Sequence, residues 1–327
     1  MKDLILKSLS NINSINNFFS GIATVFMLHR VHPFELGSLL PNENMKVSPY
    51  FLEKFIIQLK SQGYDFISLN RLYDILINSI KVKKQIIFTL DDGYRDNYEI
   101  AFPIFKKHNI PFTIYICTSF PEKTAHLWWH VLEDLIIQNS ELVLSDGSRF
   151  KCNTENEKID TFLKIRGKII SFDQSDFLNK LNDLFIEYKI NWLSKCSELS
   201  MSWAQIIELS KENLVTIGGH TNNHFALNKL SQAEIMDEIV VANKLLEKRI
   251  GTKIEHFAYP FGTKNEIFQR ECDIVKGLGF KTAATARCGT IYPKHRNYLY
   301  CLPRIMLTEN LDILDIGKIR RKRMVTI

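Results

Sequence analysis

The stretch Gln85-Ile-Ile-Phe-Thr-Leu-Asp-Asp-Gly-Tyr-Arg-Asp-Asn-Tyr98 decides the fold. Its apolar first part has the length and β-branched content of a buried strand. Two adjacent carboxylates, Asp91 and Asp92, follow it directly, and Gly93 then allows the chain to turn. A helical pattern leads on to a second apolar run at 111–117. We therefore interpret the stretch as the start of a strand–helix–strand unit.

The two adjacent carboxylates lie where the first strand of this unit meets its loop. In parallel α/β folds, ligands and chemistry gather at that carboxyl end. Asp91 and Asp92 would repel each other unless a positive group lies between them, and a divalent metal is the simplest candidate. The structural alternative is a helix N-cap, Asp92, beside a solvated aspartate. The pair alone does not decide between the two readings.

The same alternation of strands and helices runs through most of the chain. We expect about eight strands, which argues for an α/β fold with a parallel barrel. They are predicted at 23–28, 65–68, 86–90, 111–117, 214–218, 255–258, 280–285 and 299–307, and helices at 49–62, 72–80, 203–209, 232–249 and 266–278. Residues 121–200 lack this rhythm: helices at 127–137 and within 155–190, and a hairpin at 142–150, predict a mainly helical insertion over one face of the barrel.

Length and composition fit one soluble barrel domain over residues 1–327. Hydrophobic residues make up 45% and charged residues 24% of the 327 positions, which is ordinary for a globular protein. Six scattered cysteines argue against a cysteine metal site and a disulfide scaffold, and favour a reducing compartment. The net charge of +6 is modest, so we expect no nucleic-acid partner. No secretory signal or membrane span is visible, so a cytoplasmic protein is expected.

Two histidines, His220 and His224, follow the strand at 214–218. On a helical turn, their i, i+4 spacing puts both imidazoles on one face, close enough to share a metal. The pair alone is a weak signal. Together with Asp91 and Asp92 at another strand end, it becomes a site with two histidines, one carboxylate and open positions for water and substrate, which is the form of catalytic zinc sites.

Two further strand ends carry candidate residues. Tyr259-Pro260-Phe261-Gly262 follows the strand at 255–258, and its proline and glycine predict a sharp turn that leaves backbone N–H groups pointing into a pocket. An ordinary βα turn is the alternative. His29 follows the strand at 23–28, where it is either a site residue or a loop histidine without a ligand role.

These motifs together resemble the polysaccharide deacetylases, the NodB-type carbohydrate esterases. Residues 89–93, Thr-Leu-Asp-Asp-Gly, are similar to the family's T-F-D-D-G signature, residues 220–224 match its H-[ST]-x-x-H block, and residues 259–262 correspond to its R-x-P-Y-G block. The resemblance covers roughly 22–118 and 200–307. Its wider context, Ser202-Trp203 and Leu302-Pro303-Arg304, resembles the bacterial surface-glycan branch.

The resemblance implies a distorted (β/α) barrel of about seven to eight parallel strands. It also implies one divalent metal ion, expected to be Zn²⁺, held by Asp92, His220 and His224. Asp91 would be the general base that takes a proton from water, and the backbone N–H of Phe261 would help to hold the oxyanion. The products would be a free amine and acetate.

The chain departs from the family pattern at two positions. The arginine of the third block falls on Ala258, so we assign the orientation and charging of Asp91 to Arg304. The family's late Leu-x-His block, which supplies the general acid, has no clear match, and His29 is our replacement. His130 and His295 are weaker alternatives.

The expected substrate contacts come from the third block and from the insertion. Tyr259, Phe261 and Gly262 are assigned to substrate binding by the resemblance. Trp129, which follows Trp128, would stack on a sugar ring, although a tryptophan pair at a helix start is as often part of a core.

We therefore expect a metal-dependent N-deacetylase that acts on an N-acetylated sugar in surface polysaccharide biosynthesis, with a lipid- or nucleotide-linked intermediate as substrate. Two alternatives remain open at this point. One is a metal-dependent amidohydrolase for a small non-sugar amide. The other is a non-catalytic carbohydrate-binding barrel, against which the intact set of Asp91, Asp92, His220 and His224 argues.

The basic residues near the end of the sequence predict peripheral contact with an anionic membrane. Five of the six positions 318–323 are basic, and each contributes about 1 kcal/mol near an anionic bilayer; a short amphipathic helix within residues 1–19 would add a shallow anchor. We expect vesicle binding at low salt that is lost at high salt and on removal of residues 318–327, measured by co-sedimentation. Binding that the truncation leaves unchanged would contradict this expectation, as would none at low salt; a solvated tail is the alternative.

Overall fold

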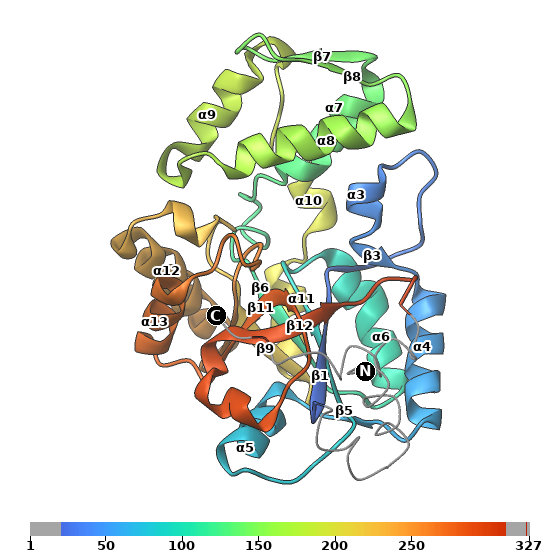
Figure 1. Cartoon of the computed structure of the whole chain (residues 1–327), viewed down its shortest axis with the longest axis vertical. Coiled ribbons are helices and arrows are strands. Elements are labelled where there is room, and N and C mark those ends of the chain that lie inside the picture. Colours follow the sequence, from blue (N-terminus) through green and yellow to red (C-terminus); the bar gives the residue numbers. More distant parts are fainter. Residues whose placement is uncertain (1–20, 312–324, 326–327) are drawn as a thin grey trace, which may run out of the picture.

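The computed structural model describes residues 21–311 and residue 325. Seven parallel strands close into a barrel in the order β1, β12, β11, β10, β9, β6 and β5, with β5 pairing back onto β1 (Figure 1). An eighth parallel strand, β4, pairs with the start of β5. The bounds are β1 Ala23–Leu28, β4 Asp65–Phe66, β5 Gln85–Leu90, β6 Phe112–Ile116, β9 Val215–Gly219, β10 His256–Ala258, β11 Thr282–Cys288 and β12 Leu302–Met306. The predicted parallel α/β barrel is confirmed.

Helices follow most of the strands and cover the outside of the barrel. Their bounds are α4 Pro49–Ser61, α5 Leu69–Ile77, α6 Phe102–Lys107, α11 Trp203–Ser210, α12 Gln232–Ile250 and α13 Gln269–Gly277. Serine hydroxyls cap several of these helices, as Ser68 does for α5. That cap explains why α5 begins three residues before the predicted start, since the hydroxyl accepts from the Arg71 N–H.

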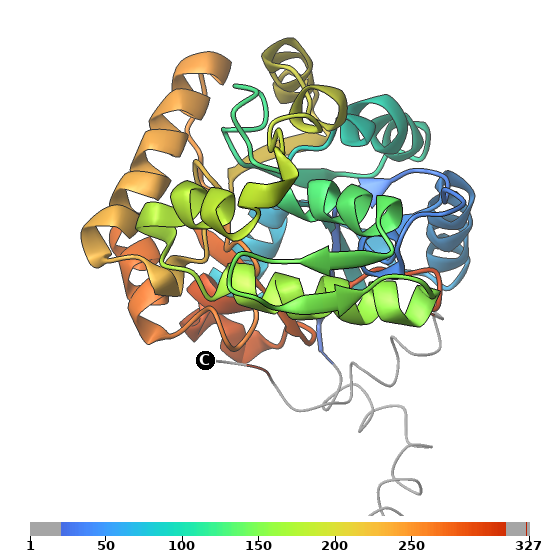
Figure 2. The ribbon, with the colours of Figure 1, turned by 90° about the horizontal axis from the view of Figure 1, so that it is seen from above.

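The insertion lies over the carboxyl end of the barrel strands, and Figure 2 views it from above. It consists of α7 Trp128–Gln138, the antiparallel hairpin β7 Glu141–Val143 and β8 Arg149–Lys151, α8 Glu155–Ile170, α9 Phe177–Leu184 and α10 Cys196–Leu199. Its helices pack around an apolar cluster of their own, centred on Leu132, Phe162 and Leu181. Beside the insertion, and in contact with its α7 through Asn42, lies a segment that was not predicted. It consists of a small ladder of β2 Arg30–Val31 and β3 Lys46–Val47, with the short helix α3 Leu40–Glu43.

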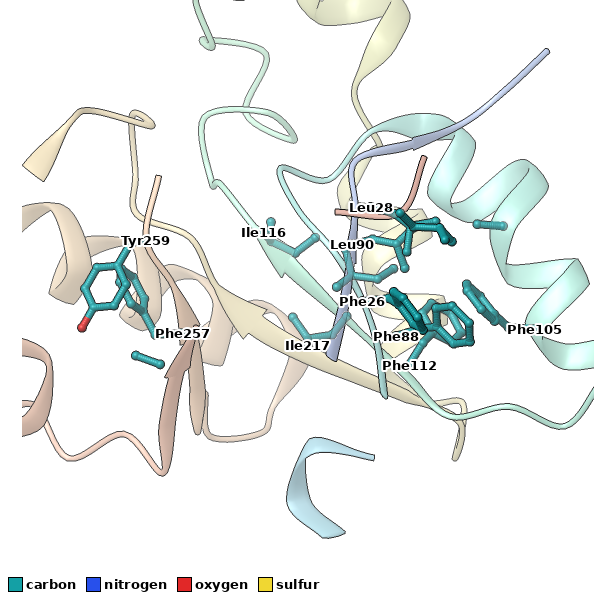
Figure 3. Close-up of a cluster of buried hydrophobic side chains, with 14 of the residues drawn as sticks. Phe26, Leu28, Phe88, Leu90, Phe105, Phe112, Ile116, Ile217, Phe257 and Tyr259 are labelled. Atoms are coloured by element: carbon teal, nitrogen blue, oxygen red, sulfur yellow. The ribbon is translucent and has the colours of Figure 1, made fainter. Parts of the chain in front are cut away.

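Strand residues alternate between the inside of the barrel and the layer beneath the helices. On β5, Phe88 belongs to the large apolar cluster shared with the helices (Figure 3). Its neighbour Ile87 belongs to the cluster with Tyr115. Because side chains alternate along a strand, Thr89 and Asp91 continue the series of Ile87. This parity directs Asp91 toward the barrel axis rather than toward the helices.

The described residues include all the cysteines but not the two ends of the chain on which the membrane expectation rests. All six cysteines lie within the described residues and none forms a disulfide. Residues 1–19 and 318–323, on which the membrane expectation rests, lie outside the described residues. Within residues 21–311, no helix has the length and apolar character needed to cross a bilayer.

The aromatic cluster around Phe88 makes a stability prediction. Phe88 is fully buried and its ring lies 5.6 Å from Phe26 and 5.2 Å from Phe105. Phe88→Ala should lower the free energy of unfolding by about 3–5 kcal/mol, because the cavity left behind collapses only partly. Ile57→Ala, at an exposed position, is the matched control and should change it by less than about 0.5 kcal/mol. Urea unfolding measures both free energies. If the two substitutions lowered the free energy of unfolding equally, Phe88 would not be part of the stabilising core.

Candidate active site

A cavity of about 430 Å³ lies between the carboxyl ends of the barrel strands and the insertion. Nearly all the candidate residues line it. These are Asp91, Asp92, His220, His224, Arg304, His29, Tyr259, Phe261 and Trp129. Gly262 does not line the cavity, because its Cα packs against the backbone of Ala286: an added Cβ would lie 2.8 Å from the Ala286 nitrogen.

The three predicted metal ligands lie together at the bottom of this cavity. The Nε2 atoms of His220 and His224 each lie 3.2 Å from Oδ1 of Asp92. The His220 Nδ1–H donates to the carbonyl of Ala258 at 2.8 Å, which leaves the Nε2 lone pair directed at the cluster. No other group of three or more such ligands is found within residues 21–311.

The arrangement of these donor atoms fits a shared cation. Oδ1 of Asp92 is buried without a hydrogen-bond donor although two imidazole nitrogens lie close to it. A buried carboxylate oxygen without a donor is costly. Burial opposes ionisation of Asp92, yet the neighbouring His224 and His220 hold its pKa well below the usual range. Two nitrogens and one carboxylate oxygen are a ligand set that zinc takes.

The loops that carry the cluster have strained backbones. Four residues at this site have a positive φ: Asp92 (76°), Thr221 (64°), His224 (59°) and Phe261 (60°). Side chains other than glycine rarely occupy this region, at a cost of about 1–3 kcal/mol each. Such strain persists only where the surrounding structure holds it, and it gathers at functional sites.

A carboxylate on α12 holds the histidine loop in this strained form. Glu238 accepts from the N–H of Asn222 (3.1 Å), from the N–H of Asn223 (2.8 Å) and from the Asn223 side chain (2.6 Å). From the opposite side, the N–H groups of Thr118 and Ser119 donate to the loop's carbonyls. The loop between the two histidines is thus fixed from both sides.

Asp91 forms a bidentate ion pair with Arg304 inside the barrel. Each guanidinium nitrogen, Nη1 and Nη2, lies 2.7 Å from one carboxylate oxygen, and both residues are buried. Nη1 also donates to the Thr89 hydroxyl, and Nε donates to the Thr285 carbonyl. Burial raises the pKa of Asp91, but the charge and hydrogen bonds of Arg304 outweigh it, so that the pKa is lowered overall. Asp91 is therefore ionised at physiological pH.

His29 lies at the end of β1 and faces the two aspartates. Its Nδ1 is buried without a partner, and its backbone carbonyl accepts from the Asn97 side chain at 2.8 Å. Burial lowers its pKa, against the opposing charges of Asp92 and Asp91. Of the alternatives, His295 is outside this cavity and bonds to the carbonyl of Val325.

An aromatic group joins the insertion to the aspartate loop. Trp129 donates its indole N–H to the Tyr94 hydroxyl at 3.0 Å, and its ring centre lies 5.4 Å from that of His224. The Tyr94 hydroxyl lies 3.2 Å from Nε2 of His130. Burial lowers the pKa of His130 to about 3, so the imidazole that forms this hydrogen bond with Tyr94 is neutral. Tyr259 contributes only its ring to the lining of the cavity, because its hydroxyl donates a hydrogen bond to the Tyr300 carbonyl.

The sequence pattern did not predict three residues of this site. Tyr94 stands two positions after Asp92, and that closeness to the motif was the one available signal. Glu238 and Arg166 belong to helices, α12 and α8, whose sequences carry no motif. Their relation to the site depends on how those helices pack.

Comparisons with known proteins bear on the family and the fold of the chain. The family model described as polysaccharide deacetylase matches residues 79–283, which is more than half of the chain. The poly-beta-1,6-N-acetyl-D-glucosamine N-deacetylase of Staphylococcus aureus is 22% identical over 268 residues, covering 82% of this chain and 70% of that protein.

Two solved structures have the same fold. The Streptococcus pyogenes deacetylase PplD, in complex with acetate, gives a TM-score of 0.60 at 19% identity, over 91% of this chain and 97% of that one. IcaB from Ammonifex degensii gives 0.59 at 18% identity, over 93% and 98%. The match to the family model, together with the motifs at the strand ends, leads to one conclusion: the chain belongs to the polysaccharide deacetylase family.

Proposed function

We propose that this protein is a metal-dependent N-deacetylase, which removes the acetyl group from an N-acetylated sugar in surface polysaccharide biosynthesis. The single observation that carries the proposal is the convergence, in one cavity, of the Asp92–His220–His224 cluster with the ionised Asp91. The cluster of Asp92, His220 and His224 suits a divalent metal ion, for which we propose zinc. The ionised Asp91 suits a general base. The reaction adds water across the amide bond and yields an amine and acetate.

Asp91 is proposed as the general base. Its carboxylate is ionised and kept in place by two hydrogen bonds from Arg304. A low pKa makes it a weak base by itself. A bound divalent ion would lower the pKa of a coordinated water to about 7 and polarise the acetamide carbonyl. A weak but ionised and oriented carboxylate then suffices to accept the proton.

His29 and Phe261 are proposed for the remaining steps. The backbone N–H of Phe261, in the turn after β10, would donate to the oxyanion that forms on the carbonyl oxygen. His29 would pass to the leaving nitrogen the proton that Asp91 has taken from water, because burial lowers the pKa of His29 overall and its ring has no extra proton of its own to give. The amine then departs neutral. The unpartnered Nδ1 of His29 supports this role; burial opposes protonation of the ring, whereas the two aspartates favour it.

The substrate is proposed to be an N-acetylated sugar on a lipid or nucleotide carrier. The insertion covers the barrel mouth and leaves a cavity of about 430 Å³, which is the size range of small-molecule sites. Trp129 and Phe261 would supply the apolar contact for the sugar ring. We propose a cytoplasmic enzyme that meets its substrate at the anionic membrane surface. Acetate release from N-acetylated sugars tests the activity, and a protein that hydrolyses only non-sugar amides would favour the amidohydrolase alternative.

The metal assignment predicts the effect of removing one ligand. His220→Ala should reduce the bound divalent ion from about one per chain to a small fraction, because a site of three protein ligands tolerates the loss of one poorly. Elemental analysis after dialysis measures it. His108→Ala is the control, because His108 lies on the outside of the barrel, beside Glu53. Equal metal content in the two variants would contradict the assignment of His220 as a metal ligand.

The assignment of the base predicts a variant that keeps metal and loses turnover. Asp91→Asn should lower kcat by about 10²–10⁴-fold, because the amide cannot accept the proton, with metal content unchanged. It should also lower stability, because Arg304 then remains buried without its counter-charge. Activity is therefore measured at a temperature where circular dichroism shows the variant folded, with Asp74→Asn as the exposed control. Normal turnover by Asp91→Asn would contradict the role of Asp91 as general base and leave it only a structural role.

A further inference from the structure

The charges that line the cavity are balanced by neighbours, with one exception in the described part of the chain. Arg304 is paired with Asp91, and Arg30 is paired with Asp96 at 2.7 Å. Arg166, on α8 of the insertion, also lines the cavity. No ion pair or hydrogen bond is found for its guanidinium within residues 21–311. The cavity therefore presents one cation without a partner of opposite charge.

Arg166 is exposed overall, but part of its side chain is covered by neighbouring atoms at the cavity. Its guanidinium carbon lies 5.9 Å from the ring centre of Phe261, in a cation–π contact. Burial lowers its pKa, with an opposing influence from the charge of Glu266. That carboxylate does not reach the guanidinium as an ion pair, since it accepts hydrogen bonds from the N–H and hydroxyl of Thr263.

Arg166 is close enough to the metal cluster to contact the same substrate molecule. The Phe261 ring, on which the guanidinium packs, lies 5.0 Å from the ring centre of His224. The Phe261 ring thus contacts both the guanidinium and His224, a proposed metal ligand, so one substrate molecule that covers this ring would reach both. The acetamide would lie at the ligands, while a substituent elsewhere on the same sugar would lie at Arg166.

We propose that Arg166 binds an anionic substituent of the substrate, so that the enzyme acts on N-acetylated sugars that carry a phosphate or a carboxylate. This inference rests on the proposed deacetylase function and narrows its substrate class. A guanidinium recognises both oxyanions through paired N–H donors. The phosphate would come from a carrier linkage, and the carboxylate from a neighbouring uronic acid.

The test measures binding and turnover separately. The probes are N-acetylglucosamine 1-phosphate, the disaccharide of N-acetylglucosamine with glucuronic acid, and the neutral methyl glycoside of N-acetylglucosamine. Calorimetric titration of the metal-loaded protein should give a Kd at least about tenfold lower for one anionic probe than for the neutral one, the size of one charge-assisted hydrogen bond. The anionic probe that binds with the lower Kd identifies the source of the anion: a phosphate of a carrier linkage or a carboxylate of a neighbouring uronic acid.

The variants attribute this preference to one side chain. Arg166→Gln should abolish the tenfold preference and leave the Kd of the neutral glycoside within about twofold, while Arg166→Lys should retain part of it. Lys164→Gln is the matched control on the same helix; Lys164 is exposed and paired with Asp160, so its loss should change neither Kd. Equal affinities in the unmodified protein would overturn the inference, as would a preference that survives in Arg166→Gln.

The two proposals fail in distinguishable ways. If no probe releases acetate, the proposed function is lost, whereas the binding preference still decides the role of Arg166. If the neutral glycoside is hydrolysed with the same kcat/KM as both anionic probes, the deacetylase function stands and the anion site is lost.

Discussion

The site depends on the buried ion pair between Asp91 and Arg304. Asp91 directly follows β5 and Arg304 lies on β12. These two strands are separated in the barrel by β1, so the contact crosses the inside of the barrel. A buried arginine without its partner would cost about 3–5 kcal/mol, and two further hydrogen bonds, to Thr89 and Thr285, orient it. Because Arg304 balances one of two adjacent aspartates, Asp92 remains free to face the histidines.

The rest of the barrel end supports a strained arrangement. Asp92, Thr221, His224 and Phe261 all have a positive φ, and each lies in a loop or turn that follows a strand of the barrel. The closed barrel makes those strand ends rigid, and Glu238 on α12 then fixes the histidine loop through three hydrogen bonds. The lone pairs of three ligands can therefore converge although the backbone alone would disfavour their positions.

The insertion turns this open barrel end into an enclosed site. Its helices pack around an apolar cluster that is separate from the large cluster of the barrel, and they bring Trp129, His130 and Arg166 to the cavity. In the proposed mechanism, the barrel would supply the acid–base and ligand chemistry, and the insertion would supply contacts to the substrate beyond its acetamide. Differences in substrate between members of such a fold are expected to lie in this part.

The sequence by itself determined the parallel barrel and the positions of Asp91, Asp92, His220 and His224 at strand ends. Strand patterns are local, and the carboxyl ends of parallel strands meet at one end of a barrel however far apart they are in the chain. The sequence also suggested Arg304 as the partner of Asp91, but only the tertiary structure shows their bidentate contact. It alone decided that Gly262 lies outside the cavity and that Arg166 lines it. These outcomes depend on side-chain direction across the barrel and on the docking of α8, which no local pattern encodes.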